Sequence, residues 1–131
     1  MSVSLQRDLI DAPEAPAAIG PYSHAVRSGG LLFCSGMIPL DPATGELVKD
    51  SVGAETERCL KNLEAVCEAG GTKLERTLKA TIYTTDLDRF AEINEAYGSF
   101  FEGSPPARAA IGVASLPKGV KVEIEAIVAA P

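Results

Sequence analysis

The chain has 131 residues and a formal net charge of −6, and this length suits one compact domain, residues 1–131, with its own core. Apolar residues make up 46% and charged residues 23% of the chain, which is typical of a globular protein and argues against wholesale disorder. The negative charge opposes binding to nucleic-acid backbones and anionic lipid, and no apolar run is long enough for a transmembrane helix. We therefore expect a protein that binds neither nucleic acid nor membrane.

The N-terminus and the thiols favour a cytoplasmic protein. The first residues, MSVSLQRDLIDAPEAP, lack the basic stretch followed by an apolar stretch that marks a signal peptide. Cys34, Cys59 and Cys67 are an odd number of cysteines without CxxC spacing. Such cysteines are typical of reduced and mostly buried thiols.

The N-terminal third predicts three strands. Residues 3–10 form the first, and the Pro- and Gly-rich stretch DAPEAPAAIGPY that follows is a fixed loop rather than a helix. SHAVRSGGLLFCSG predicts a β-hairpin, with two apolar runs joined across Ser28-Gly29-Gly30. DPATGEL predicts a second turn.

The middle of the chain predicts a helix and then a strand. Over residues 51–69, helical spacing creates one apolar stripe, formed by Val52, Cys59, Leu60, Leu63, Val66 and Cys67. Ser51 is a suitable N-cap, and Gly70-Gly71 a suitable stop. Residues 76–85, RTLKATIYTT, alternate and are rich in β-branched side chains, as expected of a strand.

The last third predicts a second helix and two closing strands. The helix begins at Asp86 or Asp88 and runs to about Phe101, with an inward face formed by Phe90, Ile93, Tyr97 and Phe101. Strands follow over 107–114 and 120–129, separated by the SLPKG turn. The order β-β-β-α-β-α-β-β predicts an α+β fold with two helices on one face of a mixed sheet. An identical subunit could cover the other face.

The common catalytic and cofactor motifs are absent. The chain has no GxGxxG, P-loop or HExxH motif. His24, the sole histidine, has no GxSxG elbow, so a loop-edge position without a catalytic role is favoured over a Ser-His-Asp triad. Cys59 and Cys67 lie on the apolar stripe of the first helix, which favours core positions over zinc ligands. The chain also lacks tryptophan and a basic run with interleaved aromatics, so no base-stacking surface is indicated.

Arg108 lies among residues that cannot pair with it, in the stretch PPARAAIG. In a strand, alternation puts Arg108 on one face with Ala110 and Gly112, and puts Ala109, Ile111 and Val113 on the other, which we expect to be the core face. The small neighbours of Arg108 leave room for a small molecule. On the last strand, Glu123 and Glu125 share the face opposite to the apolar residues, and either could lie near Arg108 if the two strands are neighbours.

Two interpretations of this pair remain open. A cross-strand ion pair is a common structural solution, worth about 0.2–1 kcal/mol when exposed, and spacing alone favours it. The functional alternative is a carboxylate clamp beside an acid/base group, because the planar guanidinium binds a carboxylate bidentately and keeps its proton.

Three further positions suggest a small polar site. Asn94 interrupts the apolar stripe of the second helix, either as a partly wet edge position or as an amide lining a pocket. Tyr22 and Ser35-Gly36 offer a hydroxyl and a bare backbone near strand ends. Taken alone, these residues are more simply explained as turn residues that bond their own backbone.

Four stretches occur together in this chain: APAAIGPYSHAV, FCSGMIPLDPATGELV, DLDRFAEINEAYGSFF and PPARAAIGVASLPKGVKVEIEAIVA. In this order, from about residue 13 to 129, they resemble the RidA (reactive intermediate deaminase A) family, also called YjgF-like. The resemblance implies a chorismate-mutase-like, ferredoxin-like α+β fold and a homotrimer with sites between subunits. It also implies a hydrolase that protects metabolism by deaminating 2-imino acids such as 2-iminobutanoate and 2-iminopropanoate. These imines arise from enamines released by PLP-dependent dehydratases, and the products are 2-oxo acids and ammonia, with no cofactor and no metal.

The same resemblance implies roles for individual residues. Arg108 matches the arginine that holds the substrate carboxylate, and Glu123 matches the glutamate associated with the catalytic water. The positions that match other pocket residues are Tyr22, Ser35, Gly36, Asn94 and Ala110, the last being a position where several members carry cysteine.

Two departures from the family pattern affect the pocket rim. Met37 replaces the glutamine of the usual SGQ, and FFEGSPPAR is shorter than in some members. Two other functions are alternatives: a non-catalytic member that binds small carboxylates, and an endoribonuclease or translation inhibitor. The net charge and the lack of an aromatic platform weigh against the second.

Overall fold

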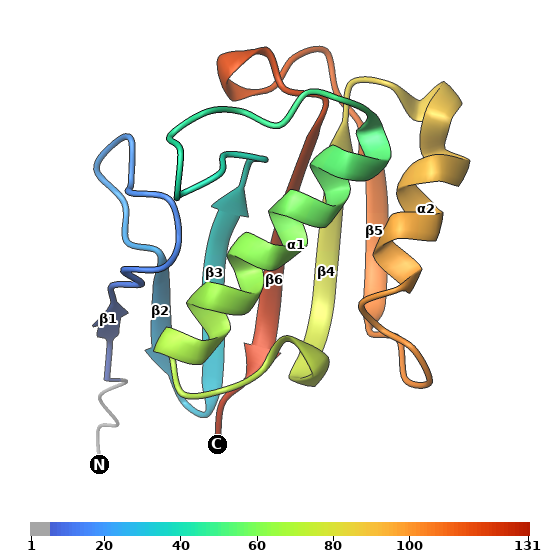
Figure 1. Ribbon diagram of the computed structural model, residues 1–131. Helices are drawn as coiled ribbons and strands as arrows, with labels where there is room; N and C mark the ends of the chain where they lie inside the picture. Colours follow the sequence, from blue (N-terminus) through green and yellow to red (C-terminus); the bar gives the residue numbers. More distant parts are fainter. Residues whose placement is uncertain (1–5) are drawn as a thin grey trace.

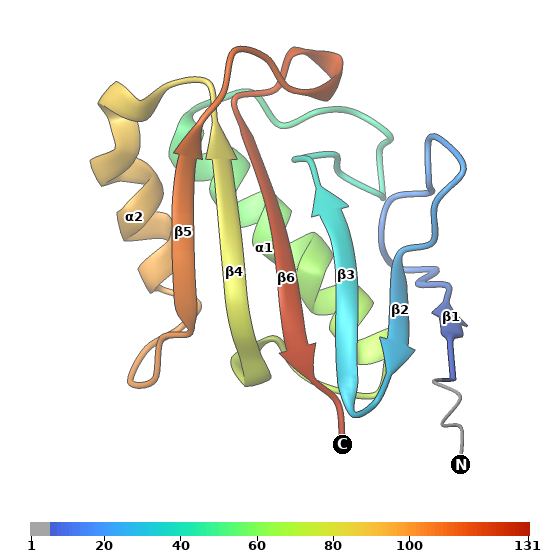
Figure 2. The ribbon, with the colours of Figure 1, turned by 180° about the vertical axis from the view of Figure 1, so that it is seen from behind.

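The fold is one mixed sheet with two helices on one side. A computed structural model describes residues 6–131 and has the predicted element order, with a six-stranded sheet in the order β1-β2-β3-β6-β4-β5. Only β4 and β5 pair in parallel. Both helices cover the same face, as Figure 1 shows, and the reverse view in Figure 2 shows the other face uncovered. The strands are Asp8–Ile10 (β1), Ala25–Ser28 (β2), Leu31–Met37 (β3), Thr77–Thr84 (β4), Ala107–Gly112 (β5) and Val122–Ala129 (β6); the helices are Val52–Ala69 (α1) and Phe90–Gly98 (α2).

The predicted hairpin is the β2–β3 pair. Its turn contains Gly29 and Gly30 at φ of 59° and 79°, a left-handed conformation that glycine adopts without steric cost. The first strand is shorter than predicted. Within the described part of the predicted range 3–10, only residues 8–10 are strand, and residues 3–5 lie outside the described residues.

Helix α1 matches its prediction in extent and in both ends. The Ser51 hydroxyl accepts a hydrogen bond from the Ala54 N–H, which satisfies one of the free donors of the first turn. The helix ends at Gly70, and Gly71 follows at a φ of 79°. Its apolar stripe forms the centre of the core with the inner residues of the sheet, and all three cysteines are free and buried there. Neither helix in the described part of the chain has the length and apolar character needed to cross a bilayer.

Helix α2 starts later than predicted. A 3₁₀ turn, Leu87–Arg89, precedes it, and neither end of this turn carries a side-chain cap. The predicted cap at Asp86 or Asp88 is therefore wrong. The Asp86 carboxylate instead lies 3.3 Å from Nε of Arg89, so it neutralises a side chain of the turn. The helix ends at Gly98, a residue of low helix propensity.

The predicted core face of β5 is reversed. Residue alternation is as expected, but the register pairs Arg108 with Ala80 and Ala110 with Ile82, and both partners are buried under the helices. Arg108 therefore faces the helical layer, whereas Ile111 is 43% exposed on the uncovered face. The physical reason is that β5 is an edge strand, covered on its helical side only by α2. Its larger apolar side chains belong to the face that one chain leaves open.

Candidate functional site

The predicted site residues form two separate groups. Tyr22, Ser35, Gly36 and Glu123 line a cavity of about 280 Å³, which we call the carboxylate cavity. Asn94 and Arg108 line a second cavity of about 400 Å³, the arginine cavity. Ala110 lies on β5 on the same face as Arg108, without lining either cavity.

Within one chain, Arg108 and Glu123 do not meet. Strand β4 lies between β5 and β6, so the condition that their strands are neighbours fails. The register pairs Glu123 with Tyr83, one residue from the inward-facing Ile82, and Glu123 therefore lies on the uncovered face, opposite to Arg108. The expected cross-strand ion pair is thus wrong, and among residues 6–131 the ion pairs within 4.0 Å do not include Arg108.

Arg108 is held by aromatic rings and an amide. Its guanidinium carbon lies 5.3 Å from the ring centre of Phe90 and 5.0 Å from that of Tyr97, within the range of cation–π attraction. Its Nη1 donates a hydrogen bond to Oδ1 of Asn94 at 2.7 Å. These three partners all come from α2, and the guanidinium remains exposed in the cavity. The arrangement orients a cation and leaves its remaining donors available to an anion.

The aromatic partners of Arg108 were missed at the sequence level. Phe90 and Tyr97 fit the apolar stripe of a helix and were expected to face the core. Tyr97 is buried, and its hydroxyl has no hydrogen-bond partner in the described part of the chain. Burial raises the pKa of this hydroxyl, with the positive charge of Arg108 acting in the opposite direction. The spacing of Phe90, Asn94 and Tyr97, four and three residues apart, was the signal that these side chains share one helical face.

In the carboxylate cavity, Gly36 brings the β3 backbone against Glu123. A Cβ atom at position 36 would overlap the Glu123 carboxylate, so a larger residue there would displace this side chain from its present position. Glu123 is half-buried, and burial, together with the negative charge of Glu125, raises the pKa of its carboxyl group. A carboxylate with a raised pKa at the wall of a cavity is a candidate general base.

Glu125 differs from Glu123 in having a partner. The Tyr83 hydroxyl donates a hydrogen bond to Oε1 of Glu125, and this bond is the main cause that raises the pKa of Tyr83. Strand alternation could not separate the two glutamates. The structure separates them, since Glu123 lines the cavity and Glu125 is bound by Tyr83.

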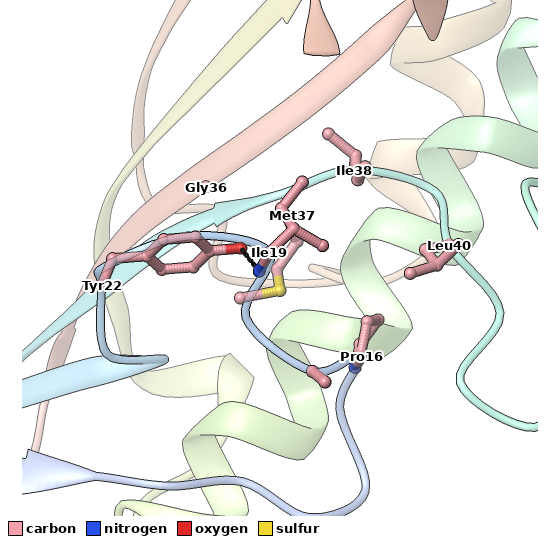
Figure 3. A pocket seen from close by; sticks show the side chains of 8 residues that line it. Pro16, Ile19, Tyr22, Gly36, Met37, Ile38 and Leu40 are labelled. Atoms are coloured by element: carbon pink, nitrogen blue, oxygen red, sulfur yellow. Dashed lines mark hydrogen bonds between the residues drawn. The ribbon is translucent and has the colours of Figure 1, made fainter. Parts of the chain in front are cut away.

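The other wall of the carboxylate cavity contains Tyr22. Its side chain is 43% exposed, and its hydroxyl accepts a hydrogen bond from the Ile19 N–H at 3.3 Å, as Figure 3 shows. Behind Tyr22 lies a small apolar cavity of about 20 Å³ whose lining includes Ile19, Met37 and Leu40. Met37, which replaces the usual glutamine, is 4% exposed, and therefore belongs to the core behind the rim.

Ser35 is occupied by the chain itself. Its hydroxyl donates to the Ser23 carbonyl at 2.6 Å, and its backbone N–H donates to the His24 carbonyl at 3.0 Å. Both donors of Ser35 are thus used, and only the lone pairs of the hydroxyl are left for a ligand. The expectation of a turn residue that bonds its own backbone is therefore wrong for Ser35, which lies in β3 and bonds a carbonyl twelve residues earlier in the chain.

Comparisons with known proteins agree with this fold. The family model described as endoribonuclease L-PSP matches residues 12–130. RutC family protein y4sK of Sinorhizobium fredii is 51% identical over 91% of this chain and 94% of its own. The 2-iminobutanoate/2-iminopropanoate deaminase of Mus musculus is 45% identical over 95% of this chain and 92% of its own. The crystal structure of E. coli TdcF with bound serine superposes with a TM-score of 0.89 at 41% identity, covering 95% of this chain and 99% of that one.

Proposed function

Because this chain belongs to the RidA family, the family of the endoribonuclease L-PSP model, we propose that it is a 2-iminobutanoate/2-iminopropanoate deaminase. The observation that carries the proposal is the state of Arg108. Its guanidinium is oriented by Asn94 and two aromatic rings, open to solvent, and without a carboxylate of its own within 4.0 Å in the described chain. Such a group fits the carboxylate of an incoming 2-imino acid.

A complete site needs two copies of the chain. Arg108 and Glu123 lie on opposite faces of the sheet, so no single copy can place both against one small substrate. The uncovered face exposes large apolar side chains, among them Phe33 and Ile111, each 43% exposed, and an uncovered apolar surface favours association. We expect a homotrimer in which the arginine cavity of one subunit faces the carboxylate cavity of the next.

The chemistry follows from these two groups. Arg108 binds the carboxylate of the substrate and so fixes the position of its iminium carbon. Glu123 accepts a proton from water while the water oxygen bonds to that carbon and the C=N π electrons move to nitrogen. Glu123 then returns the proton to nitrogen, the C–N bond breaks, and ammonia leaves. The hydroxyl group formed in the first step gives its proton to the Glu123 carboxylate, which is free again at this stage, as the C=O bond of the 2-oxo acid forms. Glu123 then releases this proton to solvent or to the departing ammonia.

Little further machinery is required, because an iminium carbon is already a strong electrophile. Orientation of water and substrate therefore supplies most of the acceleration. We assign the contacts to nitrogen and to the tetrahedral intermediate to backbone groups near Ser35-Gly36 and near Ala110. Tyr22 closes the rim of the site.

The proposal is tested by coupling the protein to a threonine dehydratase and trapping the surviving imine with semicarbazide. The wild-type protein should reduce the trapped imine, and Arg108→Ala should abolish this effect while keeping the melting temperature close to that of wild type. Trapping that is equal with wild type and with buffer would exclude the enzyme.

The two alternatives predict other outcomes of the same experiment. A non-catalytic binder of small carboxylates would be stabilised by pyruvate without changing the amount of trapped imine. An endoribonuclease, the activity in the name of the family model, would cleave RNA, and cleavage that survives Arg108→Ala after rigorous purification would identify it. The net charge of −6 opposes RNA binding.

A further inference from the structure

The loop over residues 11–22 forms part of the wall of the carboxylate cavity. Ile19 and Tyr22 line both this cavity and the small apolar cavity behind it, and Figure 3 shows the loop lying against the end of β3, with Tyr22 folded back toward Ile19. Apart from one turn, the loop has no regular secondary structure. What holds this loop therefore decides where Tyr22 lies.

The backbone of the loop bonds mainly to itself. Ala15 N–H donates to Ala12 at 3.0 Å, and Tyr22 N–H donates to Gly20 at 2.9 Å. Both bonds are local and would travel with the loop if it moved. Polar contacts between this region and the sheet come instead from two side chains, that of His24, directly before β2, and that of Ser35, in β3.

The imidazole of His24 is hydrogen-bonded through both of its nitrogens to backbone groups of the loop. Its Nδ1 accepts a hydrogen bond from the Ala12 N–H at 2.9 Å, and its Nε2 lies 2.7 Å from the Pro16 carbonyl oxygen. Because a backbone N–H can only donate, Nδ1 must accept, so the ring proton sits on Nε2 and is donated to Pro16. The ring is 5% exposed, so both bonds are protected from water.

The two contacts bracket the part of the chain that carries Tyr22. His24 holds Ala12 and Pro16 on the N-terminal side, and the Ser35 hydroxyl holds the Ser23 carbonyl on the C-terminal side at 2.6 Å. Among residues 6–131, the carboxylate within 4.0 Å of a ring nitrogen is that of Asp11, whose Oδ1 lies 3.4 Å from Nδ1 and whose side chain is exposed. The histidine that was expected to lie at a loop edge without a catalytic role is buried, and its ring connects the sheet to the rim of the cavity.

We propose that His24 is a positioning residue, which presets the loop so that Tyr22 and Ile19 form the rim before substrate arrives. The inference rests on the proposed deaminase function. A loop that is already ordered costs no conformational entropy on binding, whereas a loop that is ordered only part of the time weakens apparent affinity by the fraction that is competent. Loss of the two hydrogen bonds of His24 therefore weakens substrate binding far more than it slows the chemical step.

Two substitutions separate the hydrogen bonds from the volume of the ring. His24→Leu fills a similar space without polar atoms. His24→Gln retains an acceptor for Ala12 and a donor for Pro16. We expect His24→Leu to raise KM about tenfold with kcat within about twofold of wild type, because a loop competent for a tenth of the time gives that factor. His24→Gln should restore KM to within about threefold of wild type, since most of the competent fraction returns.

A second measurement does not depend on catalysis. Hydrogen–deuterium exchange followed by mass spectrometry should show faster exchange in segment 11–22 of His24→Leu, unchanged exchange in α1, and near-wild-type exchange in His24→Gln. An unchanged KM, faster exchange throughout the molecule, or failure of glutamine to rescue would overturn the inference. If the wild-type protein hydrolyses no imine, the proposed function fails by itself. The exchange pattern and the Kd for pyruvate in the same variants would then still decide the role of His24.

Discussion

Nη1 of Arg108 donates to Oδ1 of Asn94 across 2.7 Å, and this bond joins the edge strand β5 to the helix α2 that covers it. A hydrogen bond to a charged group contributes about 1.5–3 kcal/mol. Here the bond fixes the rotation of the guanidinium plane. Under the proposed function, we therefore expect Asn94 to act on substrate through Arg108, in addition to lining the cavity.

Substitution of Asn94 tests this relationship. Asn94→Ala removes the acceptor and should raise KM about tenfold, since roughly 1.4 kcal/mol corresponds to a factor of ten. Asn94→Asp keeps the shape but supplies a permanent carboxylate, which competes with the substrate for Arg108. Steady-state kinetics should therefore rank Asn94→Asp below Asn94→Ala, and the reverse order would contradict the role of Arg108 as a carboxylate receptor.

The pH dependence of catalysis should respond to Glu125. Burial first, and then the negative charge of Glu125, raise the pKa of Glu123. Glu125→Gln keeps an acceptor for the Tyr83 hydroxyl but removes the charge, so the pKa of Glu123 falls. Because the base must be deprotonated, the acid limb of the kcat/KM profile should move to lower pH. A limb that stays in place would mean that Glu123 is not the group that titrates.

Glu55 offers a stability test away from the site. This buried carboxylate accepts a hydrogen bond from the Lys121 N–H at 2.8 Å, and burial raises its pKa above the ordinary 4.5. A carboxyl whose folded pKa is raised favours the native state below the unfolded pKa and loses that contribution as pH rises through the folded pKa. Glu55→Gln keeps the acceptor without the charge. It should therefore melt a few degrees higher than wild type at pH 7, and the difference should disappear in acid below about pH 4.

Mixed assemblies test whether one site uses two chains. Arg108→Ala and Glu123→Gln should each be inactive alone. In trimers reassembled from equal amounts of both variants, a site is intact when a Glu123→Gln chain supplies its arginine and an Arg108→Ala chain supplies its glutamate. Each condition is met by half of the chains, so random mixing leaves about a quarter of the sites intact. Recovery of about a quarter of wild-type activity is expected. No recovery from verified mixed trimers would place the whole site within one chain.

The sequence predicted the order of the elements because local signals are strong at their ends. Ser51 caps α1, Gly29 and Gly30 turn the hairpin, and Gly70 ends the helix, as expected. Each of these depends on conformations within a few residues. The assignment of Tyr22, Ser35, Gly36, Asn94, Arg108 and Glu123 to a pocket came instead from the family resemblance. Their division between two cavities is visible only in the structure.

The face of β5 could not be predicted from alternation. Ala109, Ile111 and Val113 are more apolar than the opposite set, so they resembled a core face. In the structure Ala109 and Ile111 lie on the surface that the helices leave open, and Val113 follows the end of β5. Alternation along a strand shows which face is apolar. It does not show whether that face packs in the core or lies on the surface as an exposed apolar patch.

The role of the second helix was hidden for a related reason. Phe90 and Tyr97 have the spacing of core residues, and the cation that they hold comes from a strand ten or more residues later in the chain. Only the register of β4 with β5 brings Arg108 beneath α2. Strand order likewise decides that β4 separates the two charged groups, and no local signal carries strand order.

Under the proposed function, the separation of Arg108 from Glu123 by the thickness of the sheet makes turnover depend on protein concentration. On dilution to the point where copies part, each chain would keep its helices and its sheet, yet hold only half of the groups that the proposed hydrolysis requires. Specific activity should then decline with dilution while circular dichroism stays constant, so that an assay at nanomolar protein could mistake a dissociated enzyme for an inactive one.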